Sequence, residues 1–451
     1  MHEKHIRNGS LSHREYLALA IPLMISTLST PLLGAVDTAV VGRLSDPAYL
    51  GGVAVGTLIF NTMYWLLGFL RVSTSGFSAQ AHGANDPREM GLALLRPAMI
   101  ALAMGLVFIV LQKPIKQASF WMIGAEPSVL EHAESYVDIR IWGAPFALLN
   151  YTILGWLMGM SRIKASLLLQ ISMNVLNIVL AIVLVSYFHM NVAGVAVATL
   201  IAEVSAAGLG IWLIGLHLPL RHLFVRWKDA LSMQPMVKMM RVNRDLFIRT
   251  ACLLAVFNLF TAYGASFGKV TLAANAVLLQ IHFIMAYFLD GFANASSILV
   301  GRSIGEKNYS VYKRTVRLTG IWGAVASVIL SAVLYFGNES IISLFTTIDD
   351  VKEQIMMYAS WVLLFPFAAF WGLQLYGVFS GATEAGPVRN STIYSLLIFL
   401  LATWLFTPSY HNHGLWLSFI LFSLARSLTL WMYLPRLNRM LFPNEGGSMV
   451  E

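Results

Sequence analysis

Residues 30–42 read Thr30-Pro-Leu-Leu-Gly-Ala-Val-Asp-Thr-Ala-Val-Val-Gly42 and belong to a long apolar run that starts near Tyr16. A run of this length can cross a membrane as a helix. Asp37 is the one residue that does not fit, because a charged side chain costs roughly 2.5 kcal/mol or more at the centre of a membrane helix. The stretch therefore predicts a transmembrane helix and marks Asp37 as a candidate functional residue.

The composition of the whole chain extends this prediction. Of the 451 residues, 57% are hydrophobic and 12% are charged, whereas soluble domains are nearer a quarter charged. Helices satisfy their own backbone hydrogen bonds in lipid, so an all-α polytopic membrane protein is expected. The net charge of +8 could indicate a nucleic-acid partner. Most basic residues lie in a few short loops, however, so we expect membrane lipid and no nucleic acid as partners.

Loop residues divide the chain into twelve predicted transmembrane helices, most of them long enough to tilt, bend or protrude. The predicted spans are residues 14–43, 51–82, 91–113, 128–160, 166–188, 193–217, 244–267, 272–304, 313–337, 350–381, 389–408 and 414–437.

Lysine and arginine predict the orientation of these helices. With the N-terminus inside, 21 of the 30 lysines and arginines fall in segments on the inner side and five on the outer side. Cytoplasmic loops carry such an excess of positive charge. We therefore expect a multi-pass protein of the cell (inner) membrane with both termini in the cytoplasm.

An offset of 222 residues reveals an internal repeat. Gln80-Ala-His-Gly83 aligns with Arg302-Ser-Ile-Gly305, and Gly159 aligns with Gly381. Six helices per repeat would insert both halves the same way up, which predicts two lobes related by an axis along the membrane normal, around a central cavity. A duplication retained only for stability is the alternative. The predicted domains are an N-lobe (1–217), a cytoplasmic linker (218–243), a C-lobe (244–437) and a cytoplasmic tail (438–451).

Five ionisable residues stand out inside the predicted spans: Asp37, Arg71, Glu203, Asp290 and Arg426. Three acids against two bases leave one acid over, and burial disfavours the charged form of an unpaired carboxyl, so that group could carry a proton. We expect Asp290 to be a structural charge paired with Arg426 or Arg71. Glu203 could be a hydrogen-bonding group between closely packed helices or a second functional acid.

Asp37 is the preferred candidate for the acid left over. Pro22 and Pro31 precede it on the same helix, and each proline removes a backbone hydrogen bond and can bend a helix. A carboxyl beside such a hinge could act as a switch. An interfacial Asp37 in contact with outside water is the alternative.

A polar stripe lies on the fifth predicted helix. Gln170, Asn174 and Asn177 are spaced i, i+4, i+7 and share one helix face, and Thr199 lies on the next helix. Hydrogen bonds between helices are the commoner use of such side chains. The alternative is that the stripe lines a wet cavity together with Asp37.

Several of these segments resemble the multidrug and toxic compound extrusion (MATE) transporters. The resemblance covers almost the whole chain, and its details are similar to the prokaryotic branch named after DNA-damage-inducible protein F. It is carried by PLMISTLSTPLLGAVDTAVVGRL (22–44), SAQAHGAND (78–86), SMNVLNIVLAI (172–182), NVAGVAVATLIAE (191–203), NRDLFIRT (243–250) and FLDGFANASSILVGRSIGEKN (288–308).

This resemblance implies twelve helices in two lobes and an antiport in which cationic or amphipathic organic compounds leave as H⁺ or Na⁺ enters. It implies that Asp37 is the coupling acid, that Pro22 forms a kink, and that Tyr136, Asn177 and Thr199 form a polar network with Asn174 one turn away. No cofactor is implied beyond the coupling ion, and we expect a monomer.

Departures from the family pattern favour H⁺ over Na⁺. Many relatives have an Asp where this chain has Ala181, and the seventh predicted helix, TACLLAVFNLFTAYG, lacks the acid that sodium-driven relatives use. A Na⁺ site needs several oxygen ligands, whereas a proton needs one carboxyl. Na⁺ coupling remains an alternative, as does a lipid or oligosaccharide flippase of the same superfamily. A membrane-embedded enzyme is disfavoured, because no HExxH or GxSxG motif occurs.

Overall fold

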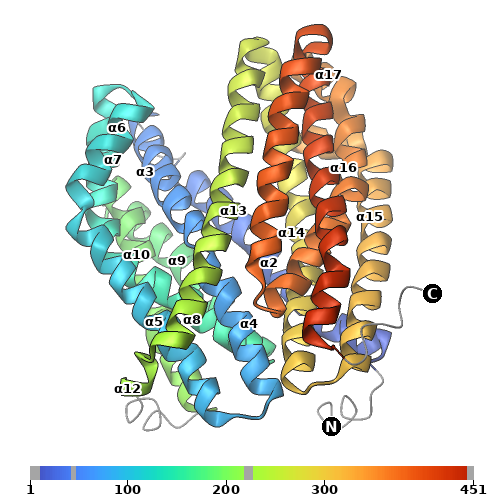
Figure 1. Ribbon diagram of the computed structural model, residues 1–451. Coiled ribbons are helices and arrows are strands. Elements are labelled where there is room, and N and C mark those ends of the chain that lie inside the picture. The colour runs from blue at the N-terminus through green and yellow to red at the C-terminus, as the bar shows by residue number, and fades with distance from the viewer. Residues whose placement is uncertain (1–10, 42–46, 218–226, 444–451) are drawn as a thin grey trace. The chain divides into compact units, whose positions relative to one another are not determined.

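The computed structural model describes residues 11–41, 47–217 and 227–443, with side chains left undescribed at 29–41, 47, 227 and 228. Every regular element in these ranges is helical (Figure 1). The α-helices are α2 (His13–Val41), α3 (Pro47–Leu66), α4 (Phe69–Gly83), α5 (Pro87–Val110), α6 (Gln112–Ile123), α7 (Pro127–Arg140), α8 (Ala144–Gly159), α9 (Ile163–Ile182), α10 (Asn191–Gly215), α12 (Trp227–Ala230), α13 (Met233–Ser266), α14 (Lys269–Gly305), α15 (Tyr309–Phe345), α16 (Asp349–Gly381) and α17 (Ala385–Leu441). The 3₁₀ helix η1 (Ile141–Gly143) links α7 to α8, and the π-helix η2 (Val183–Tyr187) follows α9.

Ten stretches of the described helices are long and apolar enough to cross a membrane. One of them, Ala385–Leu441, contains a sharp kink at His411, where φ is 47°, so it holds the predicted spans 389–408 and 414–437. Together with α2, these stretches account for all twelve predicted helices. The main difference lies at α13, which begins at Met233, inside the predicted cytoplasmic linker.

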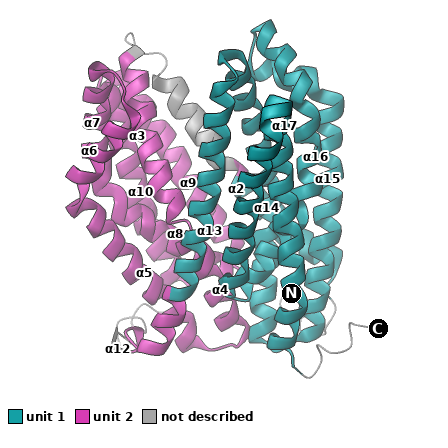
Figure 2. Cartoon of the chain, turned by 45° about the horizontal axis from the view of Figure 1, so that its top comes forward, with its two compact units in different colours: residues 1–27, 241–451 teal, residues 28–240 magenta. Residues whose placement is uncertain are grey.

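The chain divides into two compact units (Figure 2): unit 1 comprises residues 1–27 and 241–451, and unit 2 comprises residues 28–240. The first half of α2 packs on α14 within unit 1. The Tyr16 hydroxyl donates to the Phe292 carbonyl oxygen at 3.2 Å, and the Thr27 hydroxyl donates to the Tyr287 carbonyl oxygen at 2.9 Å. The predicted domain boundaries, which place this segment in the N-lobe, stay a prediction.

The backbone of the two halves repeats itself at the 222-residue offset. Six of the seven described non-glycine residues with positive φ form three pairs at this spacing, and each pair closes an equivalent connection between helices. The pairs are Asn85 and Lys307, Ser161 and Thr383, and His189 and His411. Asp86, which caps α5 by accepting from the Arg88 and Glu89 backbone amides, is matched by Asn308, which caps α15 by accepting from Val311.

Close helix crossings repeat at the same offset. In unit 2, a Cβ atom on Gly155 of α8 would lie 2.4 Å from the Arg71 carbonyl oxygen of α4. In unit 1, a Cβ atom on Gly377 of α16 would lie 2.1 Å from the Ala293 carbonyl oxygen of α14. Both residues of each crossing are displaced by 222 positions. The repeat read from the sequence is therefore a repeat of helix packing as well.

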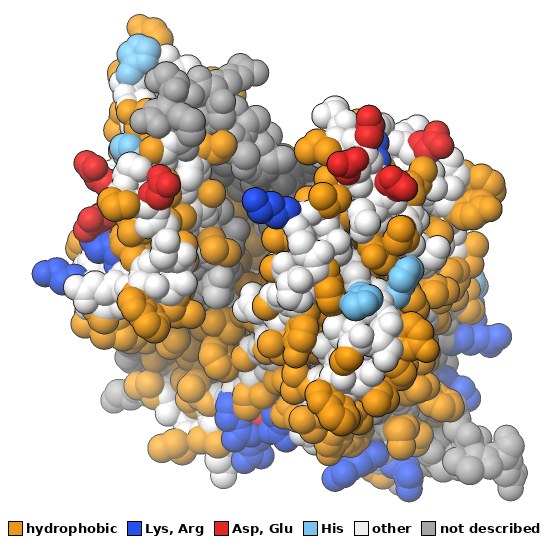
Figure 3. Space-filling view, turned by 90° about the horizontal axis from the view of Figure 1, so that it is seen from above, with side chains coloured by type: hydrophobic (Ala, Val, Ile, Leu, Met, Phe, Trp, Pro, Cys, Tyr) orange, Lys and Arg blue, Asp and Glu red, His pale blue; other side chains and the backbone are white. Residues whose placement is uncertain are grey.

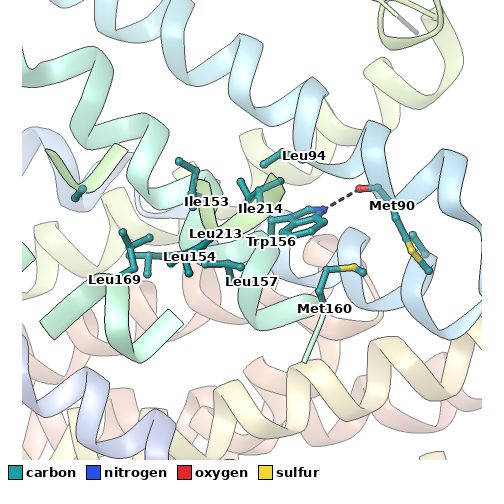
Figure 4. Packing of buried hydrophobic residues seen from close by; sticks show 12 residues of the cluster. Met90, Leu94, Ile153, Leu154, Trp156, Leu157, Met160, Leu169, Leu213 and Ile214 are labelled. Carbon is teal, nitrogen blue, oxygen red and sulfur yellow. Dashed lines mark hydrogen bonds between the residues drawn. The ribbon is translucent and has the colours of Figure 1, made fainter. Parts of the chain in front are cut away.

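Each unit has its own apolar core. In unit 2, Trp156 is fully buried among Ile153, Leu157 and Ile214, and its indole N–H donates to the Met90 carbonyl oxygen at 2.8 Å (Figure 4). In unit 1, Tyr312 lies in the equivalent core and its hydroxyl donates to Asn438 at 2.6 Å.

The outside of the molecule is apolar too. Hydrophobic side chains are widespread on the face seen in Figure 3. On α17, Leu401 and Trp404 are 62% and 73% exposed. Large apolar side chains in this number would be unfavourable in water, whereas they suit contact with lipid.

Candidate functional site

The predicted coupling helix is α2. Its backbone is helical through Pro22, Pro31 and Asp37. The side chains of Pro31 and Asp37 lie outside the described residues, whereas Pro22 is partly buried in the described half of the helix. The coupling role of Asp37 and the hinge roles of both prolines therefore stay predictions.

Unit 2 holds a buried polar cluster at the end of α7. The Arg140 guanidinium donates through Nη1 to the Tyr136 hydroxyl at 2.8 Å. It also lies 4.7 Å from the ring centroid of Phe60 and 5.8 Å from that of Tyr64, both on α3. Thr57 of α3 donates to the same Tyr136 hydroxyl at 3.3 Å. A cation surrounded by ring faces in this way is stabilised by the negative faces of the rings.

Glycine on α3 permits this arrangement. A Cβ atom on Gly56 would lie 2.3 Å from Cδ1 of Tyr136. Tyr136 is 1% exposed, so its ring has little space into which to move. Any larger residue at position 56 would displace the tyrosine that accepts from Arg140.

Glu203 on α10 supplies the acid of this cluster. It is 7% exposed and interacts electrostatically with Arg140 and with Tyr64. Its Oε2 atom has no hydrogen-bond partner among the described residues, and a Cβ atom on Gly143 would come within 2.4 Å of it. Asn150 donates to the Glu203 backbone carbonyl oxygen at 2.9 Å. The carboxyl is thus held next to a base without forming a direct ion pair.

Arg140 corrects the count of charges made from the sequence. Of the 30 lysines and arginines, 26 were assigned to the inner or the outer side, which leaves four: Arg71, Arg140, Arg249 and Arg426. Only Arg71 and Arg426 were included in the count of charges. Arg140 and Arg249 add two bases to that count, so the argument that one acid must be left over fails. Subtracting the 26 assigned lysines and arginines from the total of 30 would have revealed Arg140 and Arg249 from the sequence alone.

The predicted polar stripe separates into two hydrogen-bonded pairs. Asn177 of α9 donates to Thr199 of α10 at 2.9 Å, and Gln170 donates to Asn174 at 3.3 Å within α9. The hydrogen bonds recorded for Tyr136 are with Arg140 and Thr57 instead. Thr199 and Glu203 are four residues apart on α10 and so lie on the same helix face.

Asp290 and Arg426 belong to unit 1. Arg426 of α17 interacts electrostatically with Asp290 of α14, in the sense expected from the sequence, but the two side chains do not form a direct ion pair among the described contacts. The other predicted partner, Arg71, belongs to unit 2. The structural role of Asp290 stays a prediction.

Two repeated units of membrane-spanning helices, each with ionisable side chains inside its spans, are typical of secondary transporters. The model of the MatE family matches residues 22–183 and 246–405, one match in each half of the chain. The protein belongs to this family.

Relatives are found in bacteria and plants. The chain is similar to DNA damage-inducible protein F of Escherichia coli, with 36% identity over 416 residues that cover 91% of this chain and 90% of that protein. It is 24% identical to protein DETOXIFICATION 44, chloroplastic, of Arabidopsis thaliana, covering 91% of this chain and 80% of that one. It is 23% identical to multidrug export protein MepA of Staphylococcus aureus, covering 84% and 83%.

Solved structures support the same fold. An outward-facing multidrug resistance MATE family transporter matches with a TM-score of 0.85 at 19% identity, covering 95% of this chain and 97% of that one. A MATE protein in a bent conformation matches with a TM-score of 0.85 at 20% identity and the same coverage. The predicted MATE fold is therefore confirmed.

Proposed function

We propose that this protein is a cation-coupled antiporter of the inner membrane that exports cationic or amphipathic organic compounds, with H⁺ as the coupling ion. The observation that carries the proposal is the buried carboxyl of Glu203, which forms no direct ion pair with any residue that the structure describes and lies in the same unit as Asp37. Such a group inside a membrane helix is costly, and proton transfer is one of the functions that retain it.

The relatives support the proposed substrate class. MepA of Staphylococcus aureus is a multidrug export protein, and the outward-facing structure is of a multidrug resistance transporter. A similar role for this chain agrees with its membership of the MatE family. Export of drug-like organic compounds is therefore proposed ahead of the flippase alternative.

In the proposed mechanism, a proton and a cationic substrate compete for the negative charge of Asp37. Protonation from the outer side neutralises the carboxylate, which then no longer holds the cation, and α2 rearranges about Pro22 or Pro31. Release of the proton on the inner side restores the charge for the next substrate. The substrate moves because its affinity differs between the two protonation states.

H⁺ is proposed ahead of Na⁺ because the chain offers few hard oxygen ligands where sodium-driven relatives have acids. Position 181 is a fully buried alanine, and residues 250–266 of α13 contain no acid. Na⁺ usually requires several oxygen ligands and compensating negative charge, whereas one carboxyl suffices for a proton.

The test uses purified protein in liposomes loaded with ethidium, a fluorescent organic cation. We expect efflux when a pH gradient is the only driving force and no efflux when a Na⁺ gradient is the only one. Efflux driven by the Na⁺ gradient alone would show that Na⁺, and not H⁺, is the coupling ion. No efflux under either gradient would reject the export of organic cations and leave lipid translocation as the alternative.

A further inference from the structure

A second cluster of charges lies in unit 1, outside the site described above. It consists of Arg249 on α13, Asp290 on α14, Tyr376 on α16 and Arg426 on α17, and we call it the guanidinium cluster. Arg426 interacts electrostatically with each of the other three. Four different helices thus bring two guanidiniums and one carboxylate together within the membrane-spanning part of the chain.

The two guanidiniums are placed by aromatic rings. Cζ of Arg249 lies 4.1 Å from the ring centroid of Tyr376, and Cζ of Arg426 lies 5.6 Å from that of Phe422. Contacts with ring faces stabilise a cation but do not neutralise it. Two arginines close enough to interact repel each other, so the cluster keeps an unfavourable interaction that a bound anion would relieve.

The two guanidiniums are incompletely hydrogen-bonded at Nε. The Nε atoms of Arg249 and Arg426 are buried without a hydrogen-bond partner among the described residues. The nearest acid along α13, Asp245, is already paired with Arg244 at 2.9 Å and with Arg389 at 2.8 Å. One carboxylate, Asp290, therefore stands against two guanidiniums. Buried donors without acceptors are costly, which makes the cluster a candidate site for an anion.

The surroundings indicate what kind of anion would fit. All four residues of the cluster are partly exposed. His282 of α14, which also interacts electrostatically with Arg426, lies in a group of rings. Its ring centroid is 4.0 Å from that of Phe365 and 5.0 Å from that of Phe419. These rings are buried, with His282 and Phe365 each 4% exposed, whereas the aromatic ring within the cluster itself, that of Tyr376, is partly exposed.

We infer that the guanidinium cluster binds the carboxylate of an amphipathic aromatic compound, so that unit 1 accepts the anionic end of zwitterionic or anionic substrates. Arginine is well suited to this role, because its planar guanidinium binds a carboxylate through two parallel hydrogen bonds. The inference extends the proposed export function from organic cations to compounds that also carry an acid. It rests on that function only in assuming that the ligand is an organic substrate.

The test compares two dyes that differ in one group. Rhodamine B carries a free carboxylate, and its ethyl ester does not. Binding to the full-length protein in detergent is measured by fluorescence anisotropy for wild type, Arg249→Gln and Arg426→Gln. Loss of a charge-assisted hydrogen-bonded pair should weaken rhodamine B binding at least about tenfold and leave ester binding within about twofold. Arg244→Gln is the matched control, because it removes the same charge from α13 outside the cluster, and it should change neither dye.

Equal weakening of both dyes in the cluster variants, or no weakening of rhodamine B, would overturn the inference. Arg426→Lys should restore part of the rhodamine B affinity if charge matters. If a variant fails to fold, displacement from the wild-type protein still tests the inference. Naphthoate should displace bound rhodamine B, and the methyl ester of naphthoate should not. Displacement by phosphatidylglycerol at equal concentration would assign the cluster to lipid headgroups instead and reject the substrate assignment. Binding needs no ion gradient, so failure here is distinct from failure of the antiport proposal.

Discussion

Arg140 and Glu203 are two buried side chains of opposite charge whose contributions to stability should depend on each other. Both are buried in unit 2, at 9% and 7% exposure, and they interact electrostatically without a direct ion pair. Removing one charged partner from the interior leaves the other uncompensated, which costs more than removing both. The cluster is therefore expected to respond to mutation as a unit rather than as two independent residues.

Arg140→Met should destabilise the protein by about 1–3 kcal/mol, because it removes the positive charge that interacts with the buried Glu203 carboxyl. Adding Glu203→Gln to Arg140→Met should recover part of that loss. Thermal unfolding in detergent measures both variants, and Arg162→Met, at an exposed position, serves as the control with little effect. A double variant less stable than Arg140→Met alone would show that the two side chains do not compensate each other.

Asp37→Asn should fold normally and abolish ethidium efflux driven by a pH gradient, since an amide mimics the protonated carboxyl but cannot release a proton. Efflux from proteoliposomes is the measurement. Asp86→Asn is the matched control, because asparagine caps a helix as well as aspartate does. Wild-type efflux by Asp37→Asn would exclude Asp37 as the coupling site and make Glu203 the next candidate.

At this scale, one polar pair could be predicted from the sequence, but the contacts of Arg140 could not. The resemblance to the MATE family implied that Asn177 and Thr199 belong to one polar network, and they are hydrogen-bonded at 2.9 Å. The acceptor role of Tyr136 toward Arg140 depends on how closely α3 approaches α7 at Gly56. Such an approach is a property of helix packing and leaves no distinct pattern in the sequence.

Among the helices, the most informative feature is the pair of close crossings at Gly155 and Gly377. Each leaves no space for a Cβ atom against the backbone of a neighbouring helix. Small residues at such crossings allow membrane helices to pack through backbone contact. Backbone atoms cannot move aside as a flexible side chain can, so these glycines should tolerate no substitution without a shift of the helix.

Gly155→Ala and Gly377→Ala should each destabilise the protein by about 1–3 kcal/mol through overpacking. Gly208→Ala is the matched control, because a Cβ atom there meets nothing within 4 Å. It should be neutral or stabilising by about 0.5–1 kcal/mol, the usual gain from replacing a helical glycine. Thermal unfolding in detergent compares the three. If all three changed stability alike, the crossings would not be the reason for the glycines.

The helices themselves were largely predictable, because long apolar runs separated by polar loops leave few alternatives. The start of α13 was not, because residues 233–243 contain two basic residues, two polar ones and a proline and so resemble a loop in composition. These residues can be helical if they lie outside the apolar layer of the membrane, because a helix there does not need apolar side chains on every side.

At the scale of the whole molecule, duplication explains most of the architecture. The 222-residue offset relates loop residues with positive φ, helix caps and glycine crossings in the two halves. The ionisable side chains do not follow it: position 362, which corresponds to Arg140, is Val362, and position 425, which corresponds to Glu203, is Ala425. The halves thus share a scaffold and differ in chemistry, as expected if each lobe has a separate task.

The distribution of basic residues predicts that the N- and C-termini face the cytoplasm. In a Cys252→Ser background, a cysteine at exposed Lys113 should react with a membrane-impermeant thiol reagent in intact cells. A cysteine at exposed Lys313 should react only after the inner membrane is opened. The opposite labelling pattern would invert the topology and, with it, the direction of transport in the proposed mechanism.

The central claim, exchange of a proton for an organic cation, is tested most directly by the movement of the proton itself. Proteoliposomes in Na⁺-free buffer, with equal pH on both sides and a pH-sensitive dye inside, receive an ethidium gradient as the only driving force. The account predicts proton movement opposite to ethidium in wild type and none in Asp37→Asn. Ethidium movement without proton movement, or proton movement that appears only when Na⁺ is added, would contradict it.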